Sequence, residues 1–225
     1  MKNIITTVLV GVVLFSTNAW AGKEVNLFVS MTIVSSHVAP DGTVIVNNLS
    51  NQTYVEVSFG FITLFNWNNY DMKREIFNEH DFGVSLKLPE FKSLKPYVDF
   101  QYWGYPRTDV GYELTSTFGV KHSGLVDSHF KVTHQFGHKD LESGNRLWME
   151  VAKNFPIGKI DITSKIQVAA LDNFFGISGL AHITFGLNGK YQINKKVNLS
   201  GFLNHQKGFE MRTHWYGGIK VEYSF

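Results

Sequence analysis

The sequence predicts an all-β protein that forms a transmembrane antiparallel β-barrel of the outer-membrane type, with about twelve strands. Three observations support this prediction: apolar and polar residues alternate along most of the chain, Pro is rare with 5 residues, and the first 21 residues have the pattern of an export signal. Alternation with period two places the two kinds of side chain on opposite faces of a strand. Proline is scarce in long central strands because it removes a hydrogen-bond donor from the ladder.

Residues 1–21 contain the three parts of a secretory signal peptide. Lys2 gives the positive end, residues 4–15 form a short apolar stretch, and Ala19-Trp20-Ala21 is a small-residue cleavage site. A transmembrane helix is the alternative, but spanning a bilayer takes roughly 20 apolar residues. We therefore expect a signal peptide at 1–21 and a single barrel domain at 22–225, which would enter a membrane as a closed sheet.

The final segment shows the alternation most clearly. Trp215, Gly217, Ile219, Val221, Tyr223 and Phe225 form one set, whereas the residues that alternate with them include His214, Lys220 and Glu222. The same pattern recurs upstream, and residues 54–69 are expected to form a hairpin that turns near Gly60. The remaining strands are expected near 24–35, 80–89, 96–105, 109–121, 125–138, 145–154, 159–171, 180–193, 197–206 and 211–225.

Short and longer breaks separate these segments roughly in turn. Short polar turns are expected at 89–95, 123–124, 155–158 and 194–196, and looser breaks at 139–144, 172–179 and 206–210. The segment 36–52, which holds Pro40-Asp41-Gly42, would be the longest outer loop. Short turns on one side and longer loops on the other are typical of barrels in the outer membrane.

A soluble β-sandwich or lipocalin-like barrel would show a similar alternation. Aromatic residues near the ends of the apolar face, namely Tyr102, Tyr112, Trp215 and Tyr223, favour contact with outer-membrane lipid instead. His134 and Lys153 fall in phase with the apolar set, so each is expected near a membrane interface or beside a bulge. The terminal Phe225 is similar to the last residue of outer-membrane barrels, which implies recognition by the barrel assembly machinery.

Composition excludes several classes of function. With 21 Lys and Arg against 19 Asp and Glu, the chain has no basic excess that would predict a nucleic-acid partner. It has no Cys, so disulfides do not stabilise it. No cofactor and no metal site is expected. A lipid-modifying enzyme would need a serine activated by a histidine, and none of the 9 His is followed by Ser two residues later, although a pair across strands stays possible.

The residues between the apolar positions would line the lumen. They include charges of both signs and aromatic rings, with Lys121, Lys131, Lys220, Glu222 and Tyr97 among them. Such a wall suits a neutral solute with a flat ring and hydroxyls, because base–aromatic stacking contributes about 1–3 kcal/mol per base. A plugged lumen in which these charges pair is the alternative. The candidate solute-binding residues are Tyr54, Glu56, Asp99, Trp103, Glu113, Trp148, Glu150, Lys165, His182, Lys190, Arg212, His214 and Tyr216.

Four stretches resemble the nucleoside-specific channel-forming porins (Tsx-like). They are 51–56, 145–157, Ala181-His182-Ile183 and the last residues from Trp215 to Phe225. The resemblance implies a monomeric barrel with a narrow lumen, through which nucleosides diffuse between weak sites. It places Tyr54 and Glu56 on the first motif. The chain departs from the family pattern by its shorter outer loops and its longer first loop.

The expected function is passive diffusion of nucleosides or similar small solutes across the outer membrane. Some members of this group resemble surface receptors for phages or colicins, so the loop 36–52 is a candidate contact. A structural or adhesin-type barrel with a plugged lumen is the main alternative, and an outer-membrane lipid-modifying enzyme is a further one.

Overall fold

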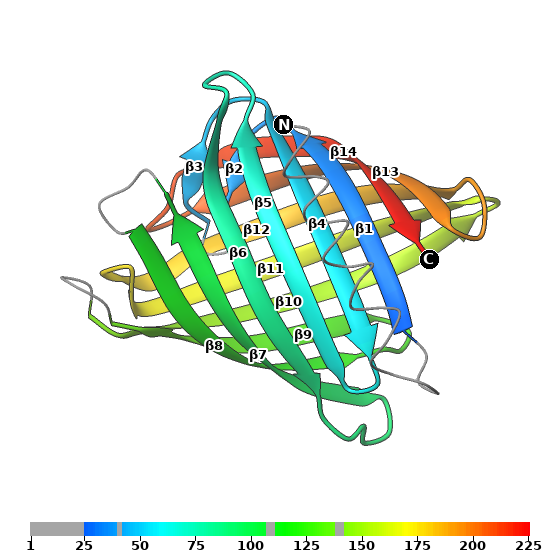
Figure 1. The fold of residues 1–225 in the computed structure, drawn as a ribbon, viewed down its shortest axis with the longest axis horizontal. Coiled ribbons are helices and arrows are strands. Elements are labelled where there is room, and N and C mark those ends of the chain that lie inside the picture. Colours follow the sequence, from blue (N-terminus) through cyan, green and yellow to red (C-terminus); the bar gives the residue numbers. More distant parts are fainter. Residues whose placement is uncertain (1–24, 40–41, 107–110, 138–141) are drawn as a thin grey trace.

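A computed structural model describes residues 25–39, 42–106, 111–137 and 142–225, so the expected signal peptide lies outside the described residues. Within these ranges twelve strands close into an antiparallel barrel, which confirms the predicted fold class (Figure 1). Neighbours in sequence pair throughout, and β1 closes the sheet by pairing with both β4 and β14. The barrel strands are β1 (Val25–Val34), β4 (Ser50–Phe59), β5 (Ile62–Asp71), β6 (Ile76–Lys87), β7 (Leu94–Tyr105), β8 (Gly111–His122), β9 (Asp127–Phe136), β10 (Gly144–Ile157), β11 (Ile160–Phe174), β12 (Ile177–Gln192), β13 (Val197–Gly208) and β14 (His214–Ser224).

The two ends of the barrel differ. At one, which we call the short-turn end, lie the turns 60–61, 88–93, 123–126, 158–159 and 193–196, together with the start of β1 and the end of β14. At the other, the loop end, lies the connection 35–49, which contains a small hairpin of β2 (His37–Val38) and β3 (Val44–Val46). No helix in the described residues is long and apolar enough to cross a membrane.

Two predicted breaks are present but shorter than expected, because the strands extend into them. β10 includes Phe155 and Pro156, and its turn is reduced to Gly158 and Lys159, with Gly158 at a φ of +63°. Pro156 is tolerated there because it lies at the end of the strand, next to the turn. β11 likewise runs to Phe174, so the break expected at 172–179 is reduced to residues 175–176. Register shifts after Ala169 and after Leu171 disturb its alternation, which is why the period-two pattern did not extend that far.

The predicted start of the last strand was wrong. β14 begins at His214 rather than at residue 211, so Arg212 lies in the connection from β13 and its side chain is exposed. β6 begins at Ile76, four residues before the expected position, because a register shift after Asn69 realigns it with β5. The hairpin that turns near Gly60 is confirmed.

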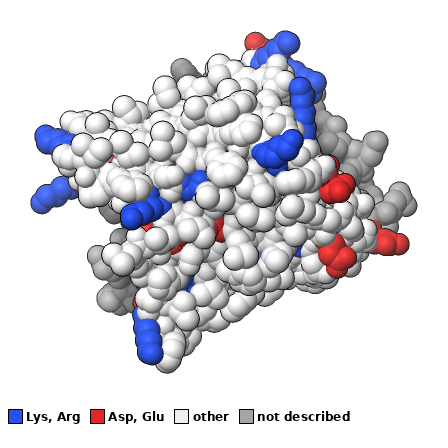
Figure 2. Space-filling model, turned by 180° about the vertical axis from the view of Figure 1, so that it is seen from behind, with Lys and Arg blue, Asp and Glu red and all other residues white. Residues whose placement is uncertain are grey.

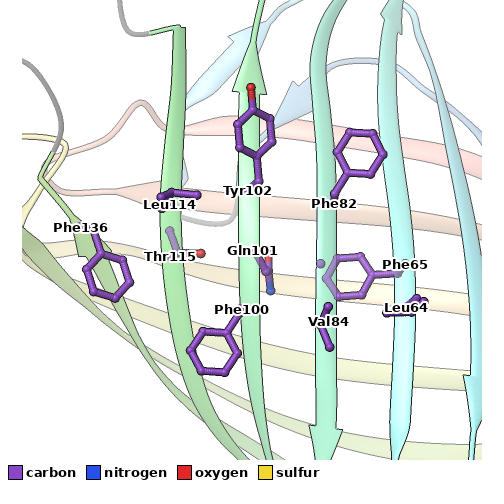
Figure 3. A pocket seen from close by; sticks show the side chains of 11 residues that line it. Leu64, Phe65, Phe82, Val84, Phe100, Gln101, Tyr102, Leu114, Thr115 and Phe136 are labelled. Atoms are coloured by element: carbon purple, nitrogen blue, oxygen red, sulfur yellow. The ribbon is translucent and has the colours of Figure 1, made fainter.

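The outer wall is apolar. Large side chains such as Phe100, Phe185, Leu187 and Ile219 are exposed on it, and most charged side chains in the view of Figure 2 lie towards the two ends. A groove on this wall crosses β5 to β9 and faces away from the lumen (Figure 3). An apolar band of this kind is the surface that outer-membrane barrels present to lipid. The groove is lined on the outside by Leu64, Phe82, Val84, Phe100, Tyr102, Leu114 and Phe136.

His134 and Lys153 both lie on the outer wall. The pairing of β10 with β9 and with β11 has no register shift, so neither residue marks a bulge. His134 Nδ1 is 3.0 Å from Asn145 Oδ1 near the loop end. Lys153 Nζ lies 5.5 Å from the ring centroid of Phe155 near the short-turn end. The expected bulge was therefore wrong, and a position near a membrane interface stays a prediction for both residues.

Candidate functional site

The inner wall is polar, and the strand register places twelve of the thirteen predicted lumen residues on it. Directly paired residues share a face of the sheet. Arg212 is the exception, because it lies in the connection between β13 and β14. Solute binding by the inner-wall residues stays a prediction. The twelve are Tyr54, Glu56, Asp99, Trp103, Glu113, Trp148, Glu150, Lys165, His182, Lys190, His214 and Tyr216.

Tyr54 and Glu56 form part of a compact site on β1, β4 and β5, which we call the aromatic–carboxylate site. The Tyr54 hydroxyl donates a 2.6 Å hydrogen bond to Glu56 Oε2. The Tyr54 ring lies with its centroid 6.0 Å from Phe28, edge to face, and 6.0 Å from Phe65, stacked. All four side chains are half-buried, so the rings and the carboxylate still face the lumen.

A glycine keeps the Phe65 ring of this site flat against the wall. Gly83 faces the lumen opposite Phe65, and a Cβ atom there would lie 2.1 Å from Phe65 Cζ. A larger residue at position 83 would therefore push the ring towards the barrel axis. The missing side chain keeps the lumen wider at this level.

Ion pairs occupy the inner wall between β10 and β14. Lys165 Nζ is 3.5 Å from Glu150 Oε2, and Gln167 donates a hydrogen bond to the same carboxylate. Glu222 accepts from Lys190 at 3.2 Å and from Lys220 at 2.6 Å. These pairs satisfy charges that would otherwise be costly inside the barrel. The predicted residues Glu150, Lys165 and Lys190 thus have partners before any solute enters.

The connection between β1 and β4 folds into the mouth of the barrel instead of standing out from it. His37 is 2% exposed, its Nε2 is 3.2 Å from Glu79 Oε2, and its ring lies 5.1 Å from the Trp67 ring. On the opposite side, Gln206 Nε2 donates a 2.8 Å hydrogen bond to the Gly42 carbonyl. The described parts of segment 35–49, residues 35–39 and 42–49, are therefore held by strands on both sides of the mouth. The long connection expected at 36–52 is present, with its limits at 35 and 49.

An apolar cluster lies beside this segment at the mouth of the barrel. Phe174, at the tip of β11, is fully buried and packs with Trp103 and Trp148, which are 6% and 8% exposed. Ile45 of β3 packs against the same cluster, and the Phe175 amide donates a 2.9 Å hydrogen bond to Gln135 Oε1. Trp103 and Trp148 were expected to present aromatic faces to a solute. The cluster covers most of both rings instead.

A serine and a histidine do meet at the mouth. Ser36 Oγ and His214 Nε2 are 2.7 Å apart, joining the β1–β4 connection to β14. A serine hydrogen-bonded to a histidine is the arrangement that activates a serine nucleophile, when a third group orients the histidine. Ser36 is only 3% exposed, however, and His214 forms no ion pair with a carboxylate within the described residues. The pair therefore fixes the inward segment to the wall. Among the residues that the structure describes, no group of three or more His, Cys, Asp or Glu side chains is placed to hold a metal ion.

Sequence reasoning missed several residues that shape the lumen. His37 and Phe174 were read as parts of loops, and both are buried inside the barrel. Phe28, Phe65 and His129 were not among the candidates, although alternation does place them on the inner face. The period-two pattern could therefore have identified those three residues as lumen-facing. It could not have done so for His37 and Phe174, which lie outside the regular alternation.

Comparison of the sequence with protein-family models and with curated proteins found no match. Solved structures do match the fold. The KdgM porin superposes with a TM-score of 0.60 over 89% of this chain and 99% of that chain, at 11% identity. The fold is that of an outer-membrane porin.

Other porin structures support this assignment of the fold. The NanC porin superposes with a TM-score of 0.54 at 8% identity, covering 88% of this chain and 98% of that chain. An outer-membrane channel from Pseudomonas putida F1 has a TM-score of 0.54 at 10% identity, over 93% and 98% of the two chains. The KdgM porin has also been solved in complex with disordered oligogalacturonate. The resemblance to nucleoside-specific porins stays a prediction.

Proposed function

We propose that this porin-fold protein is a channel of the outer membrane through which small solutes, nucleosides among them, diffuse passively. Two features support a channel: the apolar outer wall suits lipid, and the inner wall carries charges and half-buried rings around the barrel. Closing twelve strands also gives a lumen wider than that of eight-stranded barrels, which side chains can fill.

The aromatic–carboxylate site carries the proposal for nucleosides. Phe28, Tyr54 and Phe65 offer ring faces to a flat base, and Glu56 offers a carboxylate that accepts hydrogen bonds from sugar hydroxyls. Stacking of this type contributes about 1–3 kcal/mol per base. An energy of that size holds a solute briefly and still lets it leave, which conduction requires.

Export, assembly and oligomeric state complete the proposal. Residues 1–21 would be removed on export, and the chain would work as a monomer. The assembly machinery would recognise Phe225, whose side chain is 61% exposed and whose amide donates a 2.9 Å hydrogen bond to the Leu27 carbonyl. We do not extend the proposal to phage or colicin binding, because Ser36, His37 and Val46 of the candidate contact loop are buried in the mouth.

A structural barrel without conduction is the second candidate, and the loop end favours it. The inward segment 35–49 and the apolar cluster around Phe174 both occupy the mouth. Such a barrel would fold and insert but would pass no ions. Conductance therefore separates the two candidates.

The test is conductance of the purified, detergent-extracted barrel in planar bilayers, with adenosine as the probe. We expect ion conductance that adenosine reduces, and we expect Tyr54→Phe and Glu56→Gln each to weaken that block about 2–10-fold, the size of one lost hydrogen bond. Tyr191→Phe on the outer wall is the matched control and should leave the block unchanged. A folded barrel without conductance would rule out the channel function. Conductance that adenosine does not alter would rule out nucleosides as the solutes.

A further inference from the structure

Five side chains on the inner wall of β7 to β10 form a second set, which we call the cation–aromatic cluster. Its members are Tyr97, Lys121, His129, Lys131 and Trp148. The register brings them together, because Lys121 pairs with His129, and Lys131 pairs with both Gly119 and Trp148. Gly119 in turn pairs with Tyr97. The cluster therefore spans four neighbouring strands of one side of the lumen.

Contacts within the cluster fix its rings and its two ammonium groups. Tyr97 Oη and His129 Nε2 are 2.6 Å apart, and the His129 ring lies 5.2 Å from the Trp148 ring, edge to face. Lys131 Nζ sits 3.9 Å from the Trp148 ring centroid, and Lys121 Nζ sits 5.4 Å from that of Tyr97. Both distances are within the range of cation–π attraction. The ammonium groups are thus positioned by rings.

These two lysines differ from three other lysines of the inner wall. Lys165, Lys190 and Lys220 each form an ion pair with a glutamate. Lys121 and Lys131 form none within the described residues, and Lys131 is half-buried. A half-buried ammonium group without an ion pair has the capacity to bind an anion, since charge-assisted hydrogen bonds are roughly twice as strong as neutral ones.

We propose that the cation–aromatic cluster binds the anionic group of a ring-bearing solute, a phosphate or a carboxylate, as that solute crosses the lumen. The two ammonium groups would hold the anion and the Tyr97 phenol would donate to it, while the solute's ring or sugar would lie against Tyr97 and His129. The proposal rests on the proposed channel function and names a second solute class, nucleoside monophosphates or sugar acids, beside neutral nucleosides.

Asp99 links this cluster to the aromatic–carboxylate site. Its carboxylate interacts electrostatically with Lys121 and Lys131 on one side and with Tyr54 on the other. A carboxylate between the two sites lowers the attraction of the lysines for an incoming anion, so binding stays weak and reversible.

The experiment measures block of the bilayer conductance by two pairs of probes: AMP against adenosine, and galacturonate against galactose. We expect the charged member of at least one pair to block at a concentration at least tenfold below its neutral partner. Lys121→Gln and Lys131→Gln should each weaken the block by the anion about tenfold, while block by adenosine changes less than twofold. Lys131→Arg, which keeps the charge, should weaken block by the anion less than Lys131→Gln does.

Lys153→Gln on the outer wall is the matched control, since it removes a lysine without touching the lumen. Each variant is first shown to be folded by heat-modifiable migration in gels. Block by AMP alone assigns phosphate, block by galacturonate alone assigns carboxylate, and block by both assigns a general anion site. If neither anion blocks better than its neutral partner, or if the lysine variants leave the anion's block unchanged, the inference is overturned. A barrel with no conductance would instead defeat the channel proposal.

Discussion

At the scale of single residues, glycines on the inner wall decide where large rings lie. A Cβ atom at Gly119 would stand 2.2 Å from Tyr97 Cζ, so the missing side chain is what lets the Tyr97 ring lie along β8. The ring in that position reaches His129. Gly83 has the same relation to Phe65 on the other side of the lumen. Both candidate binding sites therefore depend on a glycine one strand away.

Replacing Gly119 tests this relation. Gly119→Ala should displace the Tyr97 ring, break its contact with His129 and reduce the unitary conductance. Overpacking should also lower the free energy of unfolding by about 1–3 kcal/mol. Gly189→Ala is the control, because a Cβ atom there meets nothing within 4 Å. Bilayer recordings and urea unfolding in lipid provide the two measurements, and equal behaviour of the two variants would contradict the argument.

At the scale of structural elements, the inward segment 35–49 is held by a small number of polar contacts. One side is attached through His37 and Glu79, and the other through Ser36 and His214 and through the Gly42 carbonyl. Burial lowers the pKa of His37 from 6.5 to about 4, because the interior disfavours the charged imidazolium. The docked segment therefore requires neutral His37.

Acidification should release this segment. The docked state binds fewer protons than the undocked state between pH 6.5 and pH 4, so its stability is full above pH 6.5 and is lost as the pH falls through that window. The ratio of docked to undocked protein should drop roughly 100-fold from pH 7 to pH 4. Bilayer conductance and hydrogen exchange of residues 42–49 would both report the release as an increase.

Two variants sharpen the pH experiment. His37→Gln keeps a donor for Glu79 and does not titrate, so its response to pH should be much flatter. His205→Gln, beside Trp215 on the outer wall, should behave like the unmodified protein. An unchanged pH response in His37→Gln would show that another group controls the segment.

At the scale of the whole molecule, the two faces of the wall set the environment of every strand. Leu187 is 54% exposed on the outer wall, whereas its neighbour Asn188 faces the lumen and pairs with Phe202. Leu187→Lys should cost about 2–4 kcal/mol of unfolding free energy in lipid if it lies near the bilayer midplane. Asn188→Lys is the matched control and should cost much less, because its ammonium group meets water. Equal costs would argue against a lipid-facing outer wall.

Much of this architecture could be predicted from local pattern. Alternation assigned residues such as Tyr54 and Lys165 to one face and Phe185 and Leu187 to the other, because the face of a strand is set by parity alone. The pattern did not predict the length of β11, whose bulges shift parity after Ala169. It also placed Arg212 on a strand that begins only at His214.

The sequence by itself determined the class of fold, the hairpin at Gly60 and the inner and outer faces, since these depend on neighbours along the chain. The tertiary structure decided which inner residues meet: Lys131 with Trp148, Lys190 with Glu222, and Ser36 with His214. It also decided that segment 35–49 and Phe174 turn into the mouth. These contacts depend on strand register and on closure of the sheet, which bring together residues far apart in sequence, such as Ser36 and His214, 178 positions apart.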